Sequence, residues 1–145
     1  MKKFASTLMV LLTCSILSLA QIAPAGINYQ AVARDASGNV LTSQNVGLRF
    51  TLHATTPSGT IVYRETQSLT TNAFGLFTAV IGTGTVVSGS FSLIEWENAN
   101  HYLQVELDPA GGTAYTDMGT SQLLAVPYSY AANVSERSLD NHWTA

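Results

Sequence analysis

The sequence contains very few side chains that carry out covalent chemistry. Its 145 residues include one cysteine, Cys14, and two lysines, Lys2 and Lys3. Residues 21–145 therefore have neither a thiol nor a lysine amine, which excludes a disulfide, a thiolate metal site, a cysteine nucleophile and a lysine Schiff base. Lysine–asparagine cross-links are excluded for the same reason. Exported domains of this size often use disulfides, so packing alone must hold this one.

Basic charge is equally scarce. Residues 21–145 carry four arginines against nine acidic residues, and 4 − 9 gives a formal net charge of −5. A protein that binds nucleic acid needs a basic face that displaces counterions from phosphates. We therefore expect no nucleic-acid partner and no attachment to an anionic membrane surface.

The first 20 residues have the three parts of a secretory signal. Lys2 and Lys3 precede an uncharged, mostly apolar run, and Ser18 and Ala20 are the small residues before an expected cleavage at Gln21. A membrane anchor is the first alternative, but the run is short and is diluted by Ser and Thr. A lipoprotein signal at Cys14 is the second, but the apolar run continues beyond it. We expect a secreted or cell-surface protein without a membrane span after cleavage.

Strand patterns recur along the rest of the chain. Residues 46–54 alternate strictly, with Val, Leu, Phe, Leu and Ala on one face and Gly47, Arg49, Thr51 and His53 on the other. Further strands are expected at residues 28–34, 60–69, 74–81, 102–107, 113–117 and 122–126. Residues 74–81 are nearly all apolar, which predicts a position in the middle of a sheet.

Clusters of Gly, Pro, Asn, Asp and Ser separate these strands. Turns are expected at residues 35–39, where Gly38 and Asn39 suit a positive φ, and at 56–59 and 108–112, and a loop is expected at 82–89. This spacing is typical of a sandwich or barrel. The prediction is an all-β fold, a single antiparallel β-sandwich of about seven strands, immunoglobulin-like or prealbumin-like.

Only two stretches favour a helix. Ser92 and Glu95 fit a capping box, which predicts one helical turn near residues 92–97 with Trp96 packed against an end of the sandwich. Pro127 suits the first position of a short C-terminal helix over residues 127–137. The expected organisation is a signal peptide at 1–20, an extended leader at 21–26, the β-sandwich at 27–132, and an exposed tail or the start of a stalk at 133–145.

Three segments in combination carry a family resemblance. They are GINYQAVARD at 26–35 with GNVL at 38–41, TTNAFGLF at 70–77 with Ile81 and Gly82, and YLQVELD at 102–108 leading to LLAVPY at 123–128. Together they resemble the N-terminal domain of large exported bacterial surface proteins, which stands ahead of collagen-like, tail-fibre-like or other elongated regions. The resemblance spans nearly all of residues 26–132 and implies a location and a role as a module, without a known ligand.

The turn at Gly38, followed later by TNAFGLF at 71–77, is also similar to prealbumin-like and carboxypeptidase-regulatory-like sandwiches, which are common as spacers in adhesins. There the glycine is a tight-turn position before an inward-facing aromatic residue. The end of the chain, with Trp143 on a polar tail, looks like the opening of a tail-fibre-like segment. We therefore expect the chain to be part of a longer protein.

Catalytic patterns are weak. A serine hydrolase needs a histidine held by an acid and touching a nucleophile, but His53 falls on the solvent face of its strand, His101 begins a strand and His142 lies in the tail. No G-x-S-x-G motif occurs. Glycoside hydrolysis requires two carboxylates in one cleft, and five carboxylates are candidates: Glu95, Glu97, Glu106, Asp108 and Asp117.

Metal and cofactor motifs are equally weak. Asp108 and Asp117 with loop carbonyls are the best calcium candidates, but they lack the ligand density of an EF-hand. No histidine pair has zinc spacing. The sequence therefore predicts no catalytic residue, no cofactor and no metal.

Aromatic residues give the strongest binding signal. Six could form a platform for a sugar or a protein: Tyr63, Tyr102, Tyr115, Tyr128, Tyr130 and Trp143. The leading hypothesis is a non-enzymatic surface module at the N-terminus of a fibrous or adhesive assembly, with itself, other surface proteins or glycans as partners. The expected self-association surface is Tyr128, Tyr130, Ala131, Ala132 and Trp143. A carbohydrate-binding domain is the alternative, and a small hydrolase is a third possibility.

Overall fold

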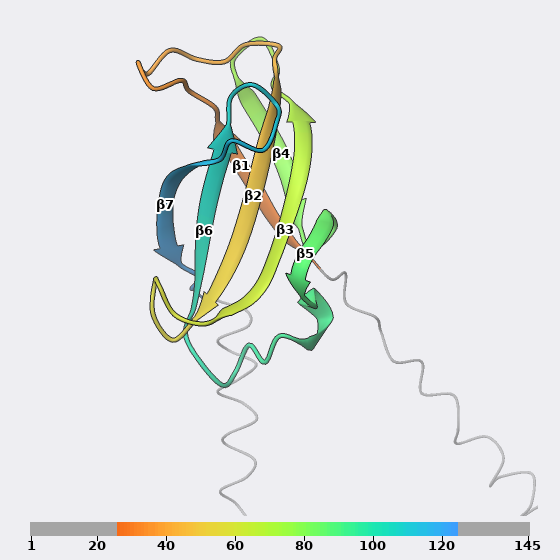
Figure 1. Cartoon of the computed structure of the whole chain (residues 1–145), viewed down its shortest axis with the longest axis vertical. Coiled ribbons are helices and arrows are strands. Elements are labelled where there is room, and N and C mark those ends of the chain that lie inside the picture. Colours follow the sequence, from red (N-terminus) through yellow and green to blue (C-terminus); the bar gives the residue numbers. More distant parts are fainter. Residues whose placement is uncertain (1–25, 125–145) are drawn as a thin grey trace, which may run out of the picture.

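The computed structural model describes residues 26–124, which form two antiparallel sheets packed face to face (Figure 1). A two-stranded sheet pairs β1 (Ile27–Val32) with β4 (Leu76–Ile81). A five-stranded sheet has the order β5-β3-β2-β6-β7. Its strands are β2 (Asn45–Ala54), β3 (Ile61–Thr70), β5 (Thr85–Gly89), β6 (His101–Asp108) and β7 (Thr116–Gln122). The predicted all-β antiparallel sandwich of about seven strands is confirmed.

The core lies between the inner faces of the two sheets. Alternation places Val46, Leu48, Phe50 and Leu52 of β2 on this face, and all four are buried, as their spacing predicts. The neighbouring strands complete the core with Tyr63, Phe77, Ala79, Ile81, Leu103, Val105 and Leu107. Burying this much apolar surface is what holds a domain without disulfides together.

Turns form where glycine permits them. Gly75 has a φ of 72° and opens β4, and its neighbour in the alternation, Phe77, points into the core. This confirms the expected tight turn before an inward-facing aromatic residue. In the turn at 35–39 only Gly38 has a positive φ, of 84°. The prediction of a positive φ at Asn39 was wrong. The backbone amide and the side chain of Asn39 both donate to the Asp35 carboxylate.

Three strand predictions were wrong in detail. β4 lies in the two-stranded sheet with alternating burial, so it is not a central strand. A loop was expected at residues 82–89, but residues 85–89 form β5. Thr85, Val86 and Val87 are β-branched and favour a strand, which pairs with β3. Residues 113–117 and 122–126 were expected as two strands, but a single strand, β7, runs over 116–122; residues 125 and 126 lie outside the described part.

The helical turn near residues 92–97 is a three-residue 3₁₀ helix, η2 (Phe91–Leu93). The predicted capping box is wrong: Ser92 lies inside the turn, and the carboxylate of Glu95 accepts a hydrogen bond from Asn98. Ile94 is extended and ends the helix. Trp96 packs only in part, since its ring lies 5.6 Å from that of Phe91 but the residue remains 43% exposed. The predicted C-terminal helix at 127–137 lies outside the described residues.

Candidate functional site

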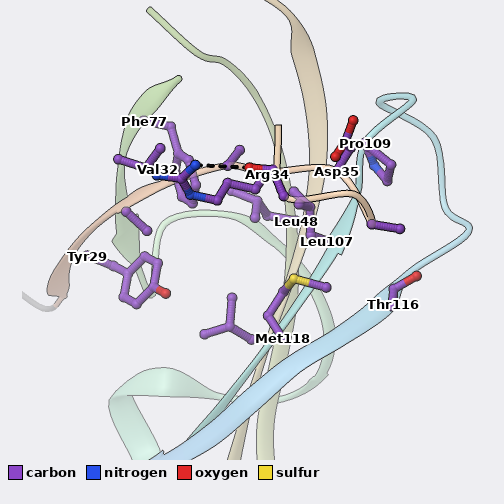
Figure 2. Close-up of a pocket in the computed structure, with 15 residues that line it drawn as sticks. Tyr29, Val32, Arg34, Asp35, Leu48, Phe77, Leu107, Pro109, Thr116 and Met118 are labelled. Carbon is purple, nitrogen blue, oxygen red and sulfur yellow. Dashed lines mark hydrogen bonds between the residues drawn. The ribbon is translucent and has the colours of Figure 1, made fainter. Parts of the chain in front are cut away.

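An apolar groove of about 480 Å³ lies between β1 and β7, above the inner faces of β2 and β6 (Figure 2). Side chains from both sheets line it, including Ala31, Leu48, Phe77, Val105, Leu107 and Met118. Tyr29 closes one part of the wall, where its ring meets Phe50 edge-on at 5.3 Å. Burial raises the pKa of the Tyr29 phenol. The groove is thus mostly hydrocarbon, with the charged side chains of Arg34 and Asp35 at one end.

The groove exists because the sandwich is closed along only one side. On the closed side, the Gln67 amide donates a hydrogen bond of 2.9 Å from β3 to the Val80 carbonyl of β4. On the other side, β1 and β7 are the outer strands of different sheets and do not pair with each other. Val32 and Met118 remain 42% and 53% exposed there. Two strands cover five, so part of the inner face at β6 and β7 has no strand above it.

Within residues 26–124, no strand pairs with the outer edge of β1. The Ala33 amide donates to the Gly75 carbonyl at 2.9 Å, in line with the β1–β4 register. Peptide groups of an antiparallel strand alternate between its two edges. The amide and carbonyl groups of Asn28, Gln30 and Val32 therefore point away from β4, toward the open side.

The charged side chains at the groove, Arg34 and Asp35, form hydrogen bonds within the turn that follows β1. The Arg34 guanidinium donates to the Gly38 carbonyl at 3.0 Å. The Asp35 carboxylate accepts from the amides of Ser37 and Asn39 and from the Asn39 side chain. These bonds, led by that of the Asn39 side chain, lower the pKa of Asp35. These two charged groups therefore stabilise a turn, and they do not converge on a reaction site.

The outer face of the five-stranded sheet is a network of polar pairs. Arg49 on β2 binds Glu106 on β6 through two hydrogen bonds, one of 2.6 Å from Nε, and its guanidinium lies 4.6 Å from the centre of the Tyr115 ring. The Glu106 carboxylate raises the pKa of Arg49. Beside them, Arg64 donates to Thr51 at 2.9 Å. The network covers this face and leaves Thr51 fully buried.

The histidines do not form a catalytic pair. The prediction that His53 faces solvent is wrong, since it is buried, with Nδ1 2.9 Å from the Gly59 carbonyl and Nε2 3.0 Å from the Gln104 side chain. The turn at 55–59 and Gln104 cover it. His101 begins β6, as expected, and is buried beside Trp96, with ring centres 5.0 Å apart. His142 lies outside the described residues.

The candidate carboxylates bind different partners, although Glu106 and Asp117 lie opposite each other on β6 and β7. Glu106 pairs with Arg49, and Glu95 binds Asn98. Asp108 accepts from the amides of Ala110 and Ala114, which lower its pKa, and Asp117 accepts from Gly119. Glu97 is exposed. Within residues 26–124, no cluster of three or more metal-binding side chains occurs.

Sequence reasoning missed Glu65, which is fully buried on β3. Its carboxylate accepts from the Tyr63 hydroxyl and the Gln67 amide, both at 2.7 Å, and from the amides of Gly82 and Gly84 at 3.0 and 2.9 Å. Four donors replace the water that a buried carboxylate loses. The signal was present in the alternation, since Tyr63, Glu65 and Gln67 share one face of their strand.

The structure divides the six candidate aromatic residues. Tyr63 is in the core and cannot contact a ligand, while Tyr102 and Tyr115 are half-buried at the outer face. A second hollow, of about 530 Å³, lies beside Tyr115, with polar walls that include Thr66, Ser68, Thr83, Thr85 and Thr113. The proposed interaction residues Tyr128, Tyr130, Ala131, Ala132 and Trp143 lie outside the described residues.

Across residues 26–124, we find no helix with the length and hydrophobicity needed to cross a bilayer. Comparisons with curated proteins and with solved structures each gave no match. One family matches residues 28–121 of the 145, a range that includes every residue that lines the groove. The chain belongs to this family, which is described as a domain of unknown function, DUF8740.

Proposed function

We propose that this domain is a non-catalytic module of an exported, cell-surface assembly and that it acts through association of its sheet edges. The observation that carries the proposal is the asymmetry of the sandwich. One side is closed by the hydrogen bond from Gln67 to Val80, and the other is an apolar groove beside the free edge of β1. Exposed strand edges are pairing sites for further strands.

The use of the polar side chains supports the same proposal. Glu65, Asp108 and Asp35 bind backbone amides of turns, while His53 and Glu106 bond to side chains and a carbonyl across the sheet. Groups that a hydrolase would use as acid or base thus serve as cross-links between strands and turns. The secretory signal expected at residues 1–20 and the likeness to N-terminal domains of exported surface proteins agree with this role.

The test is the oligomeric state and location of the chain. We expect the full chain, expressed in a bacterial host, to be exported and cleaved so that the mature protein begins at Gln21. The exported protein should form oligomers whose mass, measured by light scattering, rises with protein concentration. A protein that stays in the cytoplasm with residues 1–20 attached would contradict export. A chain that remains monomeric at millimolar concentration would contradict the associative role.

A carbohydrate-binding role is the second candidate. It is favoured by the polar hollow beside Tyr115, because sugar sites combine an aromatic face with hydroxyl and amide groups. A glycan array probed with residues 21–145 and with Tyr115→Ala distinguishes the two. Selective hits that Tyr115→Ala abolishes would support this candidate, and an array without hits would reject it.

A further inference from the structure

We propose that the groove between β1 and β7 accepts an extended strand from a second copy of this chain, formed by residues 126–132. The added strand would pair with the free edge of β1 and complete the smaller sheet. This inference rests on the proposed function and names the acceptor site for its self-association. In the assembly, residues 126–132 would be extended, in place of the short helix that the sequence predicts from Pro127.

The groove favours a strand over a small ligand. A small-molecule site combines an apolar wall with a few convergent polar groups, but Arg34 and Asp35 are both turned into the adjacent turn. In the part of the chain that the structure describes, the peptide groups of β1 at Asn28, Gln30 and Val32 have no strand partner on the groove side. They repeat along one edge with the spacing of a strand, and main-chain hydrogen bonds to such an edge are how sheets capture extended peptides.

The mostly apolar lining of the groove, whose two charged side chains are bonded within the adjacent turn, points to the donor segment. Residues 123–135 contain no charged side chain, so this segment would bury no unpaired charge in an apolar site. Within it, Val126, Tyr128, Tyr130 and Ala132 alternate with Pro127, Ser129 and Ala131. In an extended strand, one side would therefore carry the larger apolar groups toward the groove.

The position of the groove favours a second copy over the same molecule. Its walls include Thr116, at the start of β7, and Asp35 and Pro109 at the same end of the sandwich. The chain leaves β7 at the opposite end, beyond Gln122 (Figure 1). A strand that turned back after Gln122 to fill its own groove would run parallel to β1, because β1 ends where β7 begins. A strand that continues onward meets the groove of the next copy, which gives a head-to-tail contact.

The test uses the absence of cysteine from residues 21–145. One chain carries Met118→Cys in the groove and a second carries Tyr130→Cys in the donor segment. We expect a disulfide-linked heterodimer when the two are mixed under mild oxidation. The matched control replaces Met118→Cys with Val86→Cys, which has similar exposure, 56%, but lies on β5 at the far edge of the same sheet. It should give no heterodimer.

A backbone variant tests the pairing itself. Gln30→Pro removes an amide that points away from β4, so the β1–β4 ladder is left intact, and Gln30→Ala is its control. We expect Gln30→Pro to weaken self-association about tenfold and to suppress the cross-link, while Gln30→Ala changes neither. Unchanged melting temperatures for both variants show that the fold is retained.

The outcomes are distinguishable. A Met118→Cys/Tyr130→Cys chain that cross-links only within itself would overturn the second-copy proposal. Association that persists without the heterodimer, or that Gln30→Pro does not weaken, would overturn the groove as acceptor and leave the proposed function standing. A wild-type chain that does not associate at all would overturn both.

Discussion

The hydroxyl of Tyr63 donates a hydrogen bond of 2.7 Å to the carboxylate of Glu65, two residues further along β3, and both side chains are fully buried. The same carboxylate receives the amides of Gly82 and Gly84 from the turn between β4 and β5. One acidic residue therefore joins the five-stranded sheet to the turn that leaves the two-stranded sheet. Burial and the Glu65 carboxylate raise the pKa of Tyr63, so it remains a donor at any physiological pH.

We predict that Glu65→Ala lowers the free energy of unfolding by about 3 kcal/mol, because the buried Tyr63 hydroxyl and three partly buried donors lose their acceptor. Tyr63→Phe should cost about 1 kcal/mol, since it removes one donor and leaves the others bound. Urea denaturation measures both. A double-mutant cycle should show a coupling of at least about 0.5 kcal/mol. A loss below about 1 kcal/mol for Glu65→Ala would show that the carboxylate does not hold the turn.

The two turn glycines give a matched pair. Both Gly75 and Gly38 have positive φ, but a Cβ at Gly75 would lie 2.1 Å from the Val40 side chain, whereas at Gly38 nothing lies within 4 Å. We predict a loss of about 1 kcal/mol for Gly38→Ala, which is backbone strain alone. Gly75→Ala should cost at least about 3 kcal/mol, since overpacking adds to the strain. Thermal denaturation compares them, and equal losses would refute the steric account.

Arg49 tests the network on the outer face, and Arg34, in the turn at the groove, is its control. Arg49→Lys loses the two-point contact with Glu106 and the stacking on Tyr115, so we predict a loss of about 1 kcal/mol. Arg34→Lys should change stability by less than about 0.5 kcal/mol, because its single bond to Gly38 is exposed. Chemical denaturation of both variants checks this, and a larger effect at Arg34 would contradict it.

Asp108 makes the fold sensitive to acid. Bonds from the amides of Ala110 and Ala114 lower its pKa below the ordinary value of 3.8. Its stabilising contribution is therefore complete above that value and is lost as the pH falls through the lower, folded-state pKa. We predict that Asp108→Asn reduces stability at pH 7 and flattens the fall in stability below pH 4. Unfolding curves from pH 7 to pH 2 measure this, and a parallel fall in both proteins would contradict the assignment.

The sequence predicted the fold better than it predicted the site. Strict alternation located β2 and β6, and glycines located the turns, because these patterns follow from local geometry. His53 was predicted to face solvent because the side chain that covers it, Gln104, lies 51 residues away in the sequence. The groove was missed for a similar reason, since it arises from how seven strands divide between two sheets. The burial of Glu65 could have been predicted, because Glu65 shares a strand face with Tyr63 and this face lies beside the apolar face of β2.

The partners of the acidic side chains determine how the stability of the domain depends on salt. Among residues 26–124, Arg49 and Glu106 form the one salt bridge. The carboxylates of Glu65, Asp108 and Asp35 bind amides, and such short contacts are not weakened by dissolved ions in the way that exposed ion pairs are. The folded domain should therefore keep its stability from dilute buffer to concentrated salt, a property that would suit the exported location proposed above.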